Sequence, residues 1–160
     1  MIKLIAFNEK DIDVLTPIMK SAFDEDSHIH LNGQDGGPDG YDNGDFLRKW
    51  FMHPRAVPYT IYLDGQVIGA VNLWINTATQ DNRLGCLFIS PEYENKGIGR
   101  QVWTDIERMY PDTHCWYTET PVFSQRNHNF YINKCGFHCI RIDNPKDYMN
   151  GQFILRKTMK

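Results

Sequence analysis

The stretch LGCLFISPEYENKGIGRQVWTDIERMY, residues 84–110, decides the fold of this chain. It opens with a short apolar run, typical of a strand covered on both faces, which ends at Ser90 and Pro91. Apolar residues then recur at helical spacing until Pro111: Ile98, Val102, Ile106 and Met109. The pattern therefore predicts a buried strand, a glycine-bearing turn and a helix, in that order.

The turn before this helix carries two glycines, Gly97 and Gly99. A helix leaves its first backbone N–H groups unpaired, and its dipole places positive charge beside them. Glycines let a ligand approach such a backbone closely. We therefore predict that the turn and the helix N-terminus bind a phosphate group.

Two familiar phosphate-binding loops do not fit the turn. A P-loop requires Lys followed by Ser or Thr directly after the last glycine, but Arg100 and Gln101 follow Gly99. A dinucleotide-binding turn requires a third glycine three residues further on, where this chain has Val102. The phosphate ligand must therefore belong to another class.

Two blocks resemble the GNAT family of N-acetyltransferases. The first is ENKGIG, residues 94–99, which is similar to the family's motif A, although Glu94 stands where that motif has Gln or Arg. The second is SQRNHNFYINKCGF, residues 124–137, which resembles a family element that has Asn, an aromatic residue four positions later and a final Gly-Phe. The resemblance is clear over residues 84–142 and looser over the rest of the chain.

The resemblance implies acetyl-CoA as co-substrate, with no metal. In the family the glycine loop and its helix hold the pyrophosphate, and a strand N–H faces the thioester oxygen. By position, that N–H belongs to Phe88, Ile89 or Ser90. The other residues implied for the cofactor are Glu94, Asn95, Lys96, Gly97, Ile98, Gly99, Arg100 and Asn127.

Tyr131 is the candidate general acid. Family members commonly use a tyrosine at this position to protonate the departing thiolate, and a phenol with a pKa of about 10 can do so. The alternative is that Tyr131 merely packs against the cofactor. For the general base we favour Glu119, acting through water, because residues 82–86 contain no carboxylate. Other candidates lie in the next segment: Asp24, Glu25, His28 and His30.

Residues 24–45 carry most of the acidity of the chain. The net charge is −3, but this segment has seven acidic residues and no Lys or Arg, so the remainder carries +4. Its five glycines and one proline predict a long irregular loop. Three roles remain open: a solvated loop, a border of the acceptor pocket that attracts a cationic amine, or a metal site, although the EF-hand pattern is not met.

The order of predicted elements is β-α-α-β-β-β-α-β-α-β-β, a mixed α/β sheet with helices on both faces. It is the order of the GNAT family. The 160 residues suit one domain, residues 1–160. We expect no membrane span, no signal peptide and reduced cysteines, hence a cytoplasmic protein. No basic patch favours nucleic acid.

The predicted function is acetyl-CoA-dependent transfer of an acetyl group to a primary amine of a small acceptor by direct attack in a ternary complex, with a cationic acceptor as one option. Two alternatives stay open: a CoA- or acyl-CoA-binding sensor without turnover, and an acetyltransferase acting on a protein lysine or N-terminus. The resemblance also leaves open a homodimer through a C-terminal strand edge.

Overall fold

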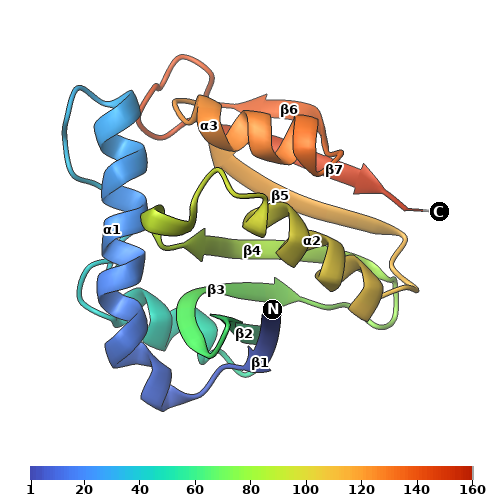
Figure 1. The fold of residues 1–160 in the computed structure, drawn as a ribbon. Coiled ribbons are helices and arrows are strands. Elements are labelled where there is room, and N and C mark those ends of the chain that lie inside the picture. Colours follow the sequence, from blue (N-terminus) through green and yellow to red (C-terminus); the bar gives the residue numbers. More distant parts are fainter. Residues whose placement is uncertain (160) are drawn as a thin grey trace.

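All seven strands lie in one mixed sheet in the computed structural model, which describes residues 1–159 (Figure 1). Their order across the sheet is β1-β2-β3-β4-β5-β7-β6, and only β4 and β5 pair in parallel. The strands are β1 (Ile2–Ala6), β2 (Val57–Leu63), β3 (Gln66–Trp74), β4 (Asp81–Ile89), β5 (Cys115–Pro121), β6 (His138–Asp143) and β7 (Gln152–Thr158). The predicted class and element order are confirmed.

Helices cover both faces of the sheet, with α2 and α3 in front in Figure 1 and α1 along the ends of the strands. The α-helices are α1 (Ile12–His30), α2 (Ile98–Met109) and α3 (Gln125–His128). Two π-helical turns, η2 (Leu47–Phe51) and η4 (Asn129–Lys134), and two 3-10 turns, η1 (Glu9–Asp11) and η3 (Pro91–Tyr93), complete the set.

The core on the α2 side is built on aromatic side chains. Trp103 of α2 and Trp116 of β5 are buried and meet edge to face, with ring centroids 5.0 Å apart. Phe137 packs against Trp103 from the other side at 5.4 Å. Large side chains of this kind bury enough apolar area to fix the position of α2 on the sheet. The glycine loop before α2 is thereby held at the end of β4.

The opposite face of the sheet carries α1 and η2. Leu15 and Met19 of α1 pack with Leu47 and Phe51 of η2 and with Phe88 of β4. Where the predicted element order has its second helix, the chain forms only this π-helical turn. Side chains of β4 therefore pack into both cores, one on each face of the sheet.

Strands β4 and β5 part after a short stretch of pairing. They pair only from Asp81 to Arg83 and from Cys115 to Tyr117, although both strands continue. Figure 1 shows the two strands diverging towards α1. Within β4, Gly85 has no partner in β3, because Leu84 opposes Leu73 and Cys86 opposes Asn72. Such a bulge bends its strand, so β4 turns away from β5 at this point.

The prediction of a loop over residues 24–45 is wrong for residues 24–30, which belong to α1. The polar residues Asp24 and Ser27 are buried on α1, where they bond to the following segment. The Ser27 Oγ donates to the Gly36 carbonyl at 2.7 Å, and the Tyr41 hydroxyl donates to Asp24 at 2.5 Å. Residues 31–46 therefore fold back onto α1 at Gly36 and Tyr41, while most of the segment stays exposed.

Asp24 anchors this segment, and its loss is expected to destabilise the fold. Burial alone would raise the pKa of Asp24, but hydrogen bonds from Lys20 and Tyr41 outweigh it and lower the pKa below 3.8. The stabilisation is therefore present above that pH and is lost as the pH falls through the lowered pKa. We predict that Asp24→Asn lowers the free energy of unfolding at pH 7 by about 1–3 kcal/mol.

Urea unfolding at pH 7 and at pH 3 measures this effect. The difference in the free energy of unfolding between the wild type and Asp24→Asn should be smaller at the lower pH. Asp39→Asn is the matched control, because Asp39 lies in the same segment but is exposed. Equal unfolding midpoints of wild type and Asp24→Asn at pH 7 would contradict the anchoring role.

Candidate functional site

The loop before α2 presents a row of free backbone donors. Asn95 and Gly97 both have positive φ, 58° and 76°, which turns successive N–H groups to one side. Among the described residues, none of the N–H groups of residues 95–100 has a hydrogen-bond partner, whereas the N–H of Gln101 bonds to the Gly97 carbonyl at 3.1 Å. Together with the helix dipole, this row suits an anion such as a diphosphate.

The two glycines of the loop serve different purposes. A Cβ added at Gly97 would meet no atom within 4 Å, so the space above the loop is open to a ligand. A Cβ at Gly99 would lie 2.9 Å from Cε1 of Phe130. Gly99 therefore lets α2 pack against η4. That Gly99 also contributes its backbone N–H to a ligand stays a prediction.

The parted strands offer further free donors. The Ser90 N–H donates to the Ile68 carbonyl at 2.7 Å, so Ser90 faces β3. In an antiparallel pair the direction alternates along the strand. The N–H of Phe88 therefore also faces β3, while those of Leu87 and Ile89 face the gap towards β5. Of the three predicted donors, only Ile89 has an N–H that faces the gap, because those of Ser90 and Phe88 face β3. The N–H of Leu87 also faces the gap, although the sequence analysis did not predict it.

Tyr131 lies in η4 with 8% of its surface exposed. Burial raises the pKa of Tyr131, and Cys86, Cys135 and Asp26 add to the effect. Cys86 belongs to β4 and Asp26 to α1, so the hydroxyl lies towards the end of the sheet where β4 and β5 part. The phenol keeps its proton at neutral pH, as a general acid must.

Asn127 precedes Tyr131 by four residues and is partly exposed. The regular helix predicted here is wrong in part, because α3 ends at His128 and the chain continues as the π-helical turn η4. The N–H of Cys135 bonds to the Phe130 carbonyl, five residues back, at 3.0 Å. π-helical turns occur often at functional sites. Gly136, with φ of 86°, follows the end of the turn, where a glycine is favoured.

Glu119 lies just beyond the last residue of β5 that pairs with β4. Its carboxylate accepts a hydrogen bond from Arg83 at 2.8 Å, and both side chains are about half exposed. Side chains alternate along a strand, so Glu119 points away from the face that holds Trp116 and Tyr131. The structure does not bring the two predicted catalytic residues onto one face of the sheet.

The other candidate bases lie on α1 and differ in burial and in their partners. Asp24 is taken up by the anchor described above, and His28 is exposed and pairs with Asp35. The His30 side chain is only 9% exposed, with Nε2 at 3.6 Å from the Asp26 carboxylate. Within residues 1–159, no cluster of three or more His, Cys, Asp or Glu side chains is arranged to hold a metal ion.

Glu94 is half of an ion pair that the sequence did not reveal. Its carboxylate accepts a hydrogen bond from Arg126 of the α3 turn at 2.7 Å. Burial raises the pKa of Glu94 to about 7; Arg126 opposes this shift, and Glu25 and Asp26 add to it. The residue that departs from motif A is therefore tied to the second block of the sequence.

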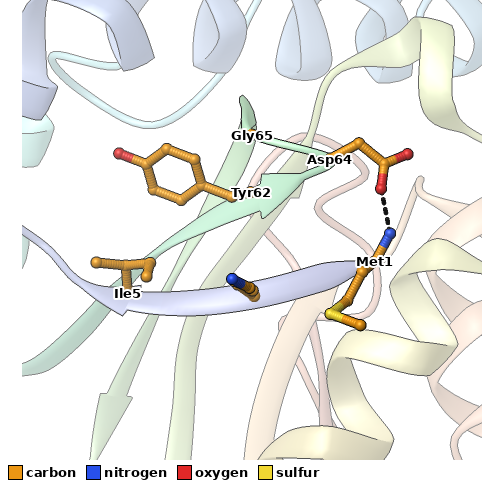
Figure 2. Close-up of a pocket in the computed structure, with 6 residues that line it drawn as sticks. Met1, Ile5, Tyr62, Asp64 and Gly65 are labelled. Carbon is orange, nitrogen blue, oxygen red and sulfur yellow. Dashed lines mark hydrogen bonds and ion pairs between the residues drawn. The ribbon is translucent and has the colours of Figure 1, made fainter.

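A surface hollow of about 430 Å³ lies elsewhere, on the edge strand β1 (Figure 2). Met1, Ile5 and Tyr62 are among the residues that line it, and the Met1 amino group pairs with Asp64. Two strands, β2 and β3, separate β1 from β4. The hollow is therefore remote from the free donors of the glycine loop, and we do not assign it to the site.

Comparison with known sequences gives two matches. The model of the Acetyltransferase (GNAT) family matches residues 20–137. The uncharacterized protein YrkN of Bacillus subtilis (strain 168) is 43% identical over 121 residues, which are 72% of this chain. The chain spans less than two thirds of that relative, 64% of its length.

Solved structures match the fold over nearly its whole length. The PaiA N-acetyltransferase of Thermoplasma acidophilum, in complex with coenzyme A, has a TM-score of 0.78 at 15% identity and covers 99% of both chains. The spermidine N-acetyltransferase of Vibrio cholerae, in complex with CoA and spermine, has a TM-score of 0.70 at 14% identity, covering 98% of this chain and 95% of its own. None of the helices described in residues 1–159 is long and apolar enough to cross a membrane.

Proposed function

Because the chain belongs to the GNAT acetyltransferase family, as its two motifs predicted, we propose that it is an acetyl-CoA-dependent N-acetyltransferase that acts on a primary amine of a small acceptor. The observation that carries this proposal is the row of free N–H groups at residues 95–100. It opens next to the gap between β4 and β5. A long, phosphate-bearing acyl carrier would bind its diphosphate on the loop and its thiol arm in the gap.

In this proposal each part of the cofactor meets a different element. The diphosphate binds the N–H groups around Gly97, with the side chains of Lys96 and Arg100 beside them. Asn127, on α3, donates to the pantetheine arm or the phosphates. The arm lies between the parted strands like an added strand, and its thioester oxygen accepts from the N–H of Ile89 or Leu87.

The chemical step then needs few protein groups. The amine nitrogen attacks the thioester carbon, and the strand N–H stabilises the oxyanion that forms; one such donor is worth about 10²–10³ in rate. When the carbon–sulfur bond breaks, Tyr131 gives its proton to the thiolate. The amine enters the gap from the face of the sheet opposite Tyr131, where Glu119 takes its proton through a water molecule and Arg83 holds the carboxylate in place.

The acidity of residues 24–45 supports a cationic acceptor. Part of this segment is the C-terminal end of α1, which lies where β4 and β5 part. Carboxylates there raise the local concentration of cations. The spermidine N-acetyltransferase with the same fold was crystallised with CoA and spermine, and spermine is a cationic amine. A homodimer through β6, the edge strand whose Ile140 and Ile142 are exposed, remains a prediction.

Thermal unfolding in the presence of CoA tests the proposal. A ligand at 100 times its dissociation constant stabilises the folded protein by about 2.7 kcal/mol, so the melting temperature should rise. Release of free thiol from acetyl-CoA is then measured with polyamines, amino acids, aminoglycosides and lysine peptides. No rise with CoA would refute the proposal. A rise without turnover on any amine would favour a sensor, and turnover on peptides alone a protein acetyltransferase.

A further inference from the structure

Arg126 joins three elements around the glycine loop. Its Nη1 lies 2.7 Å from the Glu94 carboxylate in the loop and 3.6 Å from Glu25 of α1, and its Nη2 lies 3.5 Å from Asp26. Asp26 also accepts a hydrogen bond from the buried Ser124 at 3.0 Å. The Arg126 side chain remains 29% exposed. The guanidinium is therefore fixed in position but still open to a ligand.

Most of the donors of Arg126 are unused. A guanidinium carries five N–H donors in a planar fork. Within the part of the chain that the structure describes, Arg126 makes one side-chain hydrogen bond, to Glu94, because the contacts with Glu25 and Asp26 are too long for a good one. Several N–H groups of Arg126 are thus available to an anion without breaking the bond to Glu94.

The charges around the loop make such a donor necessary. A diphosphate brings negative charge to a loop that already contains Glu94, with Glu25 and Asp26 close by. Left alone, Glu94 would repel the ligand at short range, where screening is weak. Arg126 neutralises Glu94 and faces the same loop. Arg126 thus provides the N–H donors that a Gln or Arg at position 94 would otherwise place on the loop.

We propose that Arg126 is a cofactor-binding residue, which holds Glu94 with one N–H group and donates its remaining N–H groups to the diphosphate of CoA. This inference rests on the proposed function. In it Glu94 is a positioning residue, which explains why an acid is tolerated inside a phosphate-binding loop. The planar fork of arginine suits a phosphate, and lysine would supply the charge without the fork.

Calorimetric titration with CoA and with dephospho-CoA, which keeps the diphosphate but lacks the 3′-phosphate, tests the role. We expect Arg126→Gln to raise the dissociation constants of both ligands by about 10–30-fold, in the range of a lost charge-assisted contact. Arg126→Lys keeps the charge but loses the fork, so its affinity for each ligand should lie between those of the wild type and Arg126→Gln. Arg108→Gln is the matched control, because Arg108 lies at the far end of α2 and is largely exposed.

The Glu94→Gln background separates contact from mere neutralisation. Adding Arg126→Gln to Glu94→Gln should still weaken CoA binding by at least about five-fold if Arg126 touches the phosphates. The inference is overturned if this second step has no effect, if Arg126→Gln binds both ligands within two-fold of wild type, or if only CoA is affected. Thermal unfolding checks that each variant is folded. If wild type itself does not bind CoA, the proposed function fails, and the inference fails with it.

Discussion

Replacing Tyr131 with phenylalanine is expected to lower the turnover number by about 100-fold or more, within the range of general acid catalysis. The dissociation constant of acetyl-CoA should change by less than about three-fold, because the ring that packs in the core is kept. The physical reason is the leaving group: without the phenol, the thiolate must depart unprotonated in a poorly hydrated gap. Steady-state kinetics and direct titration of acetyl-CoA measure the two quantities separately.

Tyr148→Phe is the control for this substitution, because Tyr148 is about half exposed and lies in the segment between β6 and β7. It should behave as wild type. An unchanged turnover number for Tyr131→Phe would show that Tyr131 only packs against the cofactor. A large rise in the dissociation constant with constant turnover would assign Tyr131 to binding.

Gly97→Ala is the second substitution with a large expected effect. The positive φ of Gly97 strains any other residue, by about 1–2 kcal/mol, and the new methyl group projects into the open space above the loop. That space is where the diphosphate is proposed to bind. We expect the affinity for CoA to fall by about 10–100-fold, because the methyl group keeps the phosphate from the N–H groups.

Gly33→Ala separates this effect from strain. Gly33 also has a positive φ, 79°, and open space around an added Cβ, but it lies after α1. Both variants should lose a similar amount of stability in urea unfolding, and only Gly97→Ala should lose CoA affinity. Equal CoA binding by the two variants would mean that the diphosphate does not approach Gly97.

The features that the sequence predicted are local in the chain. The order strand, turn and helix over residues 84–110 follows from apolar spacing alone, and α2 begins and ends close to the predicted positions. The dipeptide Asp64–Gly65 between β2 and β3 is a typical hairpin sequence, and both residues have the positive φ that such a turn requires. Backbone signals of this kind need no knowledge of distant residues.

The features that it did not predict depend on distant partners. Residues 24–30 look like part of a polar loop until the bonds of Asp24 and Ser27 to the segment after them are known. The pair of Glu94 and Arg126 joins residues 32 positions apart in the chain. Which N–H groups face the gap depends on the register with β3. Only Gly85 gave a usable signal, since a glycine inside a strand pattern suggests a bulge.

The contact between Gly99 and Phe130 constrains how this chain can change over evolutionary time. A methyl group at position 99 would lie 2.9 Å from the Phe130 ring, so the ring has to shift or be replaced by a smaller side chain to admit it. Substitutions at the two positions are therefore coupled, and alanine at 99 is accepted more readily once the side chain at 130 is smaller. An aromatic residue at 130 favours the second glycine of the loop by packing alone, so retention of that glycine is not by itself a record of selection for a ligand.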